Sequence, residues 1–309
     1  MTQTQTIENF GNYQLMRKIG QGGMAEVWLA TVNGAPPGSP PVVVKRLHQE
    51  LERNPDAVDL FLTEADVTLM LSHPNVIRVY DSGEVNNRYY MAMEYVHGKD
   101  LDQVIDRFRT KSKTFDPVVA SYVAAEMLTG LAYVHQAKTP TGKDLGIVHR
   151  DVTPANIFVS SSGEVKLGDF GVAKLVAVES WTMAGSVKGK LGYLSPEQIA
   201  GEAPSQSIDL WAVGIIFWEM LTGERAFVGE HELDVMLRIK KAKVPSVRKI
   251  NKAIPKQLDK ILCRALHRKQ KKRFPTAADF LAEVQKFQNE QPQKYDSATL
   301  VQYLTHELA

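Results

Sequence analysis

The sequence predicts an α+β protein made of a small β-rich lobe followed by a larger helical lobe. Over residues 10–96, short β-branched runs such as Val42–Val44 alternate with glycine, proline and asparagine turns, a pattern typical of strands. After His97, longer segments carry apolar residues at helical spacing. We therefore expect the chain to change character near residue 97, with lobes at 10–96 and 97–290. A C-terminal tail at 291–309 is expected to carry a short amphipathic helix.

The small lobe is expected to hold several strands and one main helix. Asn33–Pro41 contains four prolines and two glycines and is expected to be a loop, while Asn86-Asn87 is a tight-turn pair. Asp56–Leu71 has its apolar residues near one helical face. The expected strands are Tyr13–Met16, Val27–Ala30, Val42–Val44, Val76–Tyr80 and Tyr89–Tyr95.

The larger lobe is expected to be built from helices with recognisable ends. Asp116-Pro117 is a helix start, and Gly223 is a helix stop. Thr276 begins a capping pattern. The expected helices are 117–134, 208–222, 255–266 and 276–287, followed by 298–308, for which packing on the large lobe is favoured over a contact with a partner.

Composition argues against several classes of protein. The 309 residues carry a formal net charge of +2, which is too balanced to indicate a nucleic-acid binder. Cys263 is the single cysteine, so no disulfide forms within the chain, and a reduced, cytoplasmic protein is expected. We find no run of 18 apolar residues and no basic, apolar leader, and therefore expect neither membrane insertion nor secretion.

A glycine cluster, Gly20-Gln21-Gly22-Gly23-Met24-Ala25, is the first motif that suggests a ligand. Its G-x-G-x-x-A spacing also fits a dinucleotide-binding turn, which must lead into a helix. Here Glu26–Leu29 looks like another strand. We therefore favour a flap between antiparallel strands, whose backbone N–H groups can cover phosphates.

Lys45 follows the β-branched run Val42–Val44. A lysine at the end of a buried strand is costly to desolvate unless it is paired, and Glu64 on the following helix is the obvious partner. For either residue alone, an unpaired place on the surface would be the simpler interpretation.

The decisive segment is His149-Arg150-Asp151-Val152-Thr153-Pro154-Ala155-Asn156, followed by Asp169-Phe170-Gly171. Its two acids and one amide form an oxygen-rich cluster that suits Mg²⁺. The pattern H-R-D-x-x-x-x-N with D-F-G is highly specific. With the flap and the strand lysine upstream, the sequence resembles the eukaryotic-type Ser/Thr protein kinases, in particular the bacterial Hanks-type group, over about residues 10–290.

This resemblance implies a bilobal protein-kinase-like fold that binds ATP and Mg²⁺ and phosphorylates protein substrates. Asp151 would be the catalytic base, and Asn156 and Asp169 would hold Mg²⁺. Lys45 would contact the α- and β-phosphates while pairing with Glu64. The remaining roles are a phosphate flap at Gly20, Gly22 and Ala25, a gatekeeper at Met93, adenine contacts at Val27, Val43, Glu94, Val96 and Phe158, a ribose contact at Asp100, a structural ion pair between Glu197 and Arg273, and an anchor for the catalytic loop at Asp209.

Two positions depart from the family's pattern. Thr153 stands where the catalytic loop usually carries a lysine, and Lys190 stands where the Ser/Thr enzymes usually carry a threonine. Because the family fold places these positions side by side, we expect Lys190 to supply the missing ammonium and Thr153 the missing hydroxyl. The alternative is that the two changes are independent and leave the enzyme weakened or inactive.

Regulation and rival functions complete the interpretation. An arginine such as Arg150 often pairs with a phosphorylated residue of the activation segment in this family, and we expect autophosphorylation at Thr182 or Ser186, in trans within a homodimer. A pseudokinase or ATP-binding scaffold is the main alternative, and a small-molecule phosphotransferase is a third. Tyrosine specificity is disfavoured because the catalytic loop lacks the pattern of the tyrosine-specific group, although Lys190 weakens the usual Ser/Thr marker.

Overall fold

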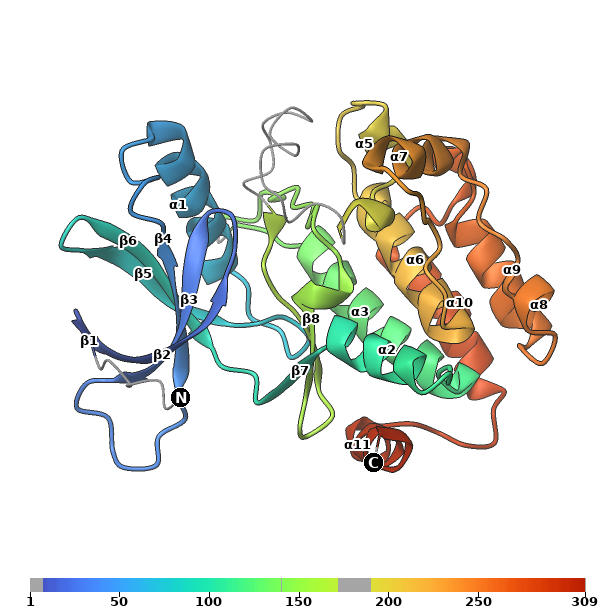
Figure 1. The fold of residues 1–309 in the computed structure, drawn as a ribbon, viewed down its shortest axis with the longest axis horizontal. Helices are drawn as coiled ribbons and strands as arrows, with labels where there is room; N and C mark the ends of the chain where they lie inside the picture. The colour runs from blue at the N-terminus through green and yellow to red at the C-terminus, as the bar shows by residue number, and fades with distance from the viewer. Residues whose placement is uncertain (1–7, 140, 172–189, 309) are drawn as a thin grey trace. The chain divides into compact units, whose positions relative to one another are not determined.

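The computed structural model describes residues 8–139, 141–171 and 190–308, and these residues form two compact units (Figure 1). The first contains residues 8–73, 77–96 and 170–171, and the second contains 74–76, 97–169 and 190–308. A sheet dominates the first unit and helices dominate the second, so the predicted α+β fold class is confirmed.

An antiparallel sheet forms the small unit, and its strands follow the order β1-β2-β3-β4-β6-β5. Their bounds are β1 (Glu8–Phe10), β2 (Tyr13–Gln21), β3 (Ala25–Val32), β4 (Val42–Leu47), β5 (Val79–Val85) and β6 (Arg88–Glu94). Asn86 and Asn87 both adopt positive φ in the β5–β6 turn, as a two-residue hairpin of this kind requires.

One face of this sheet buries an apolar cluster. Val44 on β4 and Ala92 on β6 are fully buried there, together with Leu15 of β2. Helix α1 (Pro55–Leu69) begins at Asn54, whose side chain accepts hydrogen bonds from two backbone amides of the first turn. Phe61 of α1 is buried as well, so the helix packs its apolar side onto the unit.

Two expectations for the small unit need correction. A strand was expected at Val76–Tyr80, but β5 begins only at Val79. Val76 belongs to the second unit instead, where it forms an isolated bridge to Leu167. Strand β1 was not expected, although residues 8–10 pair along the edge of β2. Its Glu8 carboxylate binds Arg46 of β4 at 2.6 Å, which ties the added strand to the sheet.

The large unit is mainly helical and also contains a three-stranded sheet in the order β7-β8-β9. The strands are β7 (Gly98–Asp100), β8 (Ile157–Ser160) and β9 (Val165–Leu167). The α-helices are α2 (Leu101–Thr110), α3 (Pro117–His135), α5 (Pro196–Ile199), α6 (Ser207–Thr222), α7 (Glu232–Lys241), α8 (Val247–Ile250), α9 (Lys256–Ala265), α10 (Ala277–Asn289) and α11 (Ser297–Leu308). Short 3₁₀ turns are η1 (Pro154–Asn156), η4 (Leu191–Tyr193) and η5 (Gln270–Lys272).

Helices α3 and α6 are the centre of the large core. The side chains of α6 are almost all buried, and α3 packs against α6 and α10. By length and composition α3 is also apolar enough to cross a membrane, but 61% of that window is buried inside the protein, as expected for a core helix. The predicted caps are confirmed, since Asp116 caps α3 and Gly223 ends α6 in the left-handed conformation.

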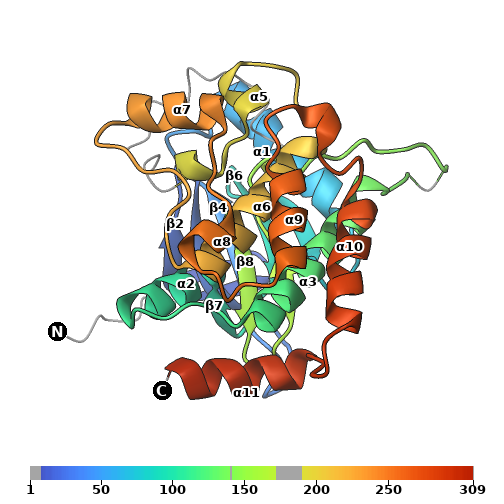
Figure 2. The ribbon, with the colours of Figure 1, turned by 90° about the vertical axis from the view of Figure 1, so that its right-hand side faces the viewer.

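The C-terminal helix α11 packs back on the large unit, as expected from the sequence. Figure 2 shows α11 running crosswise to α9 and α10, and α11 contacts α2. Leu300 is fully buried, and the Tyr303 ring stacks on Phe108 at 5.9 Å between centroids. The Tyr303 hydroxyl accepts a hydrogen bond from the Asp116 amide at 2.8 Å.

A buried ion pair joins the segment before α6 to the segment before α10. Two nitrogens of Arg273, Nη1 and Nη2, donate to the Glu197 carboxylate at 2.6 and 2.8 Å. Nε of Arg273 also donates to the His267 carbonyl at 2.8 Å, and the guanidinium lies over the Trp211 ring. The structural pair that the resemblance implied is therefore observed.

Candidate active site

One face of the small unit's sheet carries four of the predicted ligand residues. Val27 lies opposite Lys45 across β3 and β4, and Val43 lies opposite Met93 across β4 and β6. Directly opposite residues share a face, and so do residues two apart on one strand. The predicted adenine-contacting residues and the predicted phosphate-binding lysine therefore point to the same side of the sheet.

Lys45 and Glu64 form the predicted ion pair. The Lys45 ammonium donates to Glu64 Oε1 at 2.7 Å, and the two side chains are only 16% and 11% exposed. The pairing compensates both charges where solvent is scarce, which answers the desolvation problem posed by a lysine on this strand. It also fixes the ammonium on the face that carries Val27 and Val43.

The glycine cluster is a turn between antiparallel strands, so the flap interpretation is confirmed and the dinucleotide-binding turn is wrong. Gly20 pairs with Val27 across β2 and β3, and the Gly22 amide donates to the Ala25 carbonyl at 2.8 Å. One contributor was not identified from the sequence: His48, whose Nε2 lies 2.8 Å from the Gly22 carbonyl oxygen. A histidine placed directly after the lysine-bearing strand was the available signal.

Four other expected nucleotide contacts lie in or just after strands. Glu94 closes β6, and its amide donates to the Arg78 carbonyl at 2.8 Å; Val96 lies two residues further, where the first unit ends. In the second unit, Asp100 and Phe158 lie directly opposite each other on β7 and β8.

Asp100 also has a local role that was not predicted. Its side chain caps α2 by accepting a hydrogen bond from the Gln103 amide at 2.8 Å, and burial raises the pKa of its carboxyl. The ribose contact assigned to Asp100 by resemblance stays a prediction.

The catalytic-loop residues form a compact, hydrogen-bonded arrangement. Asn156 Nδ2 donates both to the Asp151 carbonyl at 2.8 Å and to Asp151 Oδ2 at 2.9 Å. His149 is fully buried, and burial lowers the pKa of its imidazole. Arg150 adopts φ +64, a backbone conformation that redirects the chain immediately before Asp151.

Asp209 anchors this loop, as the resemblance implied. Its two carboxylate oxygens accept hydrogen bonds from the His149 amide at 2.8 Å and the Arg150 amide at 2.9 Å. His135, at the end of α3, lies 2.8 Å from the same carboxylate and was not identified from the sequence. Asp209 on the core helix α6 thus fixes the backbone that directly precedes Asp151.

Asn156 and Asp169 have the donor chemistry of a magnesium site. The amide nitrogen of Asn156 is used by Asp151, so its Oδ1 is the atom left to act as a metal ligand. The Gly168 amide donates to the Asn156 carbonyl at 2.9 Å, which brings Asp169 next to this loop, and Asp169 adopts φ +52. An amide oxygen and a carboxylate fit Mg²⁺, which prefers oxygen ligands and keeps several waters.

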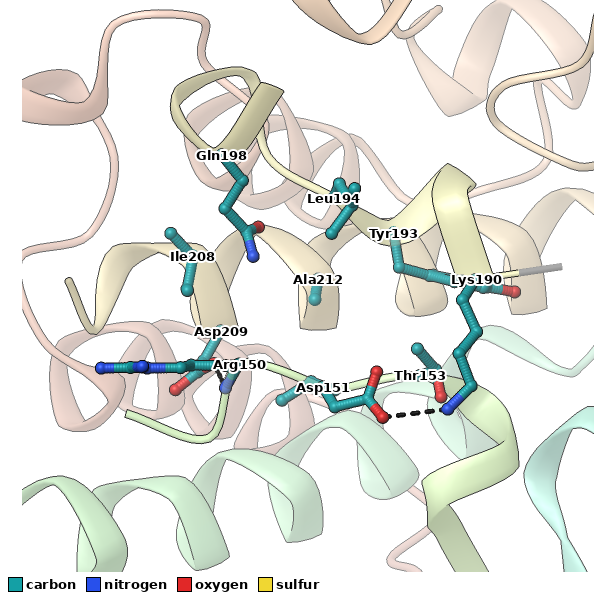
Figure 3. A pocket seen from close by; sticks show the side chains of 11 residues that line it. Arg150, Asp151, Thr153, Lys190, Tyr193, Leu194, Gln198, Ile208, Asp209 and Ala212 are labelled. Carbon is teal, nitrogen blue, oxygen red and sulfur yellow. Dashed lines mark hydrogen bonds and ion pairs between the residues drawn. The ribbon is translucent and has the colours of Figure 1, made fainter. Parts of the chain in front are cut away.

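Lys190 lies beside Asp151, as the sequence predicted (Figure 3). Its ammonium donates to Asp151 Oδ2 at 2.9 Å, and its side chain is 38% exposed whereas that of Asp151 is 8% exposed. Lys190 and Thr153 line one small hollow together with Asp151. The predicted proximity is therefore observed, whereas the catalytic roles of both residues stay predictions.

Arg150 is partly buried and has unused hydrogen-bonding capacity. Its Nε and Nη1 atoms are buried and have no hydrogen-bond partner within residues 8–139, 141–171 and 190–308. Burial lowers the pKa of this guanidinium. The predicted phosphorylation sites Thr182 and Ser186 lie outside the described residues.

Comparison with known proteins identifies the family of this chain. Residues 13–284 match the family described as the protein kinase domain. The chain is 34% identical to the tyrosine-protein kinase MasK of Myxococcus xanthus, over 92% of this chain and 44% of that protein. It is 33% identical to the serine/threonine-protein kinase PrkC of Bacillus subtilis, over 89% of this chain and 40% of that protein.

A solved structure shows the same fold. The PknI kinase domain of Mycobacterium tuberculosis superimposes with a TM-score of 0.67 at 24% identity, covering 90% of this chain and 97% of that one. The chain belongs to the protein kinase domain family, with relatives among the bacterial Hanks-type kinases. It spans less than half the length of the curated relatives MasK and PrkC.

Proposed function

We propose that this chain is a Ser/Thr protein kinase domain that transfers the γ-phosphoryl group of ATP to hydroxyl groups of protein substrates. The observation that carries the proposal is the arrangement around Asp151. Its carboxylate is held by Asn156, and its backbone segment is held by Asp209. A buried carboxylate fixed in this way can orient a hydroxyl and accept its proton.

The chemistry requires positioning and charge more than covalent participation by the protein. The substrate hydroxyl oxygen forms a bond to the γ-phosphorus, the bond between that phosphorus and the β–γ bridging oxygen breaks, and ADP leaves with the electron pair. Asp151 accepts the hydroxyl proton. Lys45, held by Glu64, binds phosphate oxygens of ATP, and Asn156 and Asp169 would hold Mg²⁺, which supplies positive charge to the phosphate oxygens.

Further parts of the proposal concern regulation and location. The Arg150 guanidinium, whose Nε and Nη1 have no hydrogen-bond partner in the described residues, suits a phosphorylated residue of the activation segment, and we propose autophosphorylation, in trans between two copies, as the activating step. A role in cytoplasmic signalling fits an ATP-dependent enzyme with a single cysteine. If the rate of autophosphorylation per enzyme molecule does not rise with protein concentration, the trans route is contradicted.

Tyrosine is the second candidate acceptor. Two observations favour it: the relative MasK carries the name of a tyrosine-protein kinase, and Lys190 replaces the threonine usual in Ser/Thr enzymes. The other curated relatives carry Ser/Thr names, as PrkC does, and Ser/Thr acceptors are therefore proposed first.

The test uses labelled ATP, Mg²⁺ and a generic basic protein. Wild-type protein should label itself and the added substrate, whereas Lys45→Met and Asp151→Asn should not. Lys138→Ala is the matched control, because Lys138 also pairs with an aspartate, Asp144, but at an exposed site. Equal labelling by wild type and both site variants would refute the kinase proposal in favour of an ATP-binding scaffold, and phosphotyrosine as the main product would refute Ser/Thr specificity.

A further inference from the structure

We propose that Lys190 is the cation that contacts the transferring γ-phosphoryl group, in place of the catalytic-loop lysine that this chain lacks. The inference rests on the proposed kinase function. It assigns a catalytic residue to the activation segment, outside the loop that carries Asp151. Thr153 is the second half of this arrangement, because it occupies the loop position from which the family's lysine reaches the phosphate.

The Lys190 ammonium lies close to the position that the attacking hydroxyl oxygen would occupy. The Lys190 ammonium lies 2.9 Å from Asp151 Oδ2. A substrate hydroxyl must come within about 3 Å of the same carboxylate to pass on its proton. The ammonium is therefore within about 6 Å of the attacking oxygen. The phosphoryl group bonds to that oxygen in the reaction, so the ammonium stands within reach of its oxygens.

The contact is buried at its Asp151 end. The Asp151 side chain is 8% exposed and that of Lys190 is 38% exposed, and both residues line a hollow together with Tyr193 and Thr153. A preorganised charge in a partly dry site stabilises developing negative charge far more than one in water does. An ordinary surface ion pair would serve no such purpose and would contribute little.

The backbone next to Lys190 is fixed, so its side chain starts from a defined place. Leu191 and Tyr193 of η4 are 5% and 4% exposed. The Tyr193 hydroxyl donates to Glu219 Oε2 at 3.0 Å, and Arg225 donates to the same hydroxyl. Lys190 precedes this turn directly and inherits its position.

Thr153 carries the complementary observation. Its side chain is buried, and its Oγ1 has no hydrogen-bond partner in the part of the chain that the structure describes. A lysine at this position would bring a second ammonium to the hollow that the Lys190 ammonium already enters, and a hydroxyl avoids that repulsion. The two departures from the family pattern thus fit one another.

During transfer Lys190 acts as a hydrogen-bond donor and takes no part in the proton transfer. The hydroxyl oxygen bonds to the γ-phosphorus, the bond to the bridging oxygen breaks, and its electron pair leaves with ADP, while the proton goes to Asp151. Lys190 donates hydrogen bonds to the phosphoryl oxygens as this happens, which lowers the barrier of the transfer step more than it strengthens nucleotide binding.

Steady-state kinetics of Lys190→Ala, Thr153→Lys/Lys190→Thr and Lys138→Ala test the proposal. Lys190→Ala should lose about 100-fold to 1000-fold in kcat, which is the usual effect of removing one preorganised donor. The double variant, which restores the family's arrangement, should recover most of that loss. Lys138→Ala should match wild type. ADP affinity, measured alongside, should be unchanged in Lys190→Ala because the γ-phosphoryl is the part of the nucleotide that the lysine is proposed to contact.

Each other outcome overturns the inference. If kcat falls by less than about 100-fold in Lys190→Ala, the proposed role is excluded. If kcat rises in this variant, the contact is inhibitory and the role is excluded as well. A double variant no more active than Lys190→Ala removes the exchange with Thr153. If wild type transfers phosphate and Lys190→Ala does so equally well, only this inference fails. If wild type and Lys138→Ala are both inactive, the proposed function fails and takes this inference with it.

Discussion

Removing one partner of the Glu197–Arg273 ion pair should destabilise the large unit strongly. The Arg273 side chain is fully buried, and that of Glu197 is 7% exposed. Methionine replaces the arginine stem with an apolar chain of similar length but leaves the Glu197 carboxylate without its two hydrogen bonds of 2.6 and 2.8 Å. A buried charge without a partner is one of the most costly defects in a folded protein.

The expected cost can be estimated from the geometry. Breaking a buried ion pair by removing one partner costs about 3–5 kcal/mol. Arg273 also donates to the His267 carbonyl and to Ser207 Oγ, so its replacement should lie at the upper end of that range. In a unit of this size, each kcal/mol lowers Tm by about 2–4 °C. Arg273→Met should therefore unfold about 10–20 °C below wild type.

The assay is thermal unfolding by calorimetry, with the double variant Glu197→Met/Arg273→Met beside both single variants. The double variant leaves no unpaired charge, so it should be more stable than either single variant. Arg264→Ala is a matched control, because its guanidinium lies over the Phe274 ring at an exposed position and contributes about 0.5–1 kcal/mol. A Tm loss in Arg273→Met no larger than in Arg264→Ala would refute the reasoning, as would a double variant less stable than both singles.

Three further predictions concern the flap, the C-terminal helix and pH. His48→Ala should raise the KM for ATP by about 2–10-fold, because the flap loses one hydrogen bond, and a KM equal to that of wild type would contradict this. Gly163→Ala should lower Tm more than Gly142→Ala. Both glycines have φ near +84, but only at Gly163 would an added Cβ clash with the Ser297 carbonyl oxygen, at 1.9 Å. Equal losses of Tm in the two variants would exclude the clash. Burial raises the pKa of Tyr90 to about 12, so the folded protein keeps a proton that the unfolded chain releases near pH 10. Stability should therefore fall as pH rises from 10 to 12, and Tyr90→Phe should reduce this fall in urea titrations at those pH values.

Local patterns predicted the longer elements of the fold well. Helix α3 has both an N-cap and a proline start, and α6 has a glycine stop, so short-range chemistry marks their ends. Helix α2 was missed although its signal was present, since Leu101, Val104, Ile105 and Phe108 are buried at helical spacing after the capping Asp100. The assignment of Asp100 to a ligand obscured its role as a cap.

Short edge elements were missed for a different reason. Strand β1 has only three residues, and it depends on pairing with β2 and on the ion pair between Glu8 and Arg46. Neither contact is encoded by a local period. The start of β5 was placed too early because Val76 is buried and β-branched like a strand residue, yet its partner is Leu167. Tertiary contacts decide such segments, and composition does not reveal them.

The same division applies to the site. Lys45 and Glu64 were paired on the physical argument that a buried ammonium needs a carboxylate nearby, and that argument needs no knowledge of the fold. The proximity of Lys190 to Asp151 could not be reached in this way, because 39 residues of chain separate them and no period connects them. Only the resemblance supplied the fold that brings these positions together. Phosphoryl transfer requires a cation near the transferring group, and under the proposal above Lys190 supplies it instead of the residue at position 153. A motif that records only the loop position would count Thr153 as a defect, whereas the structure shows the Lys190 ammonium at the Asp151 carboxylate.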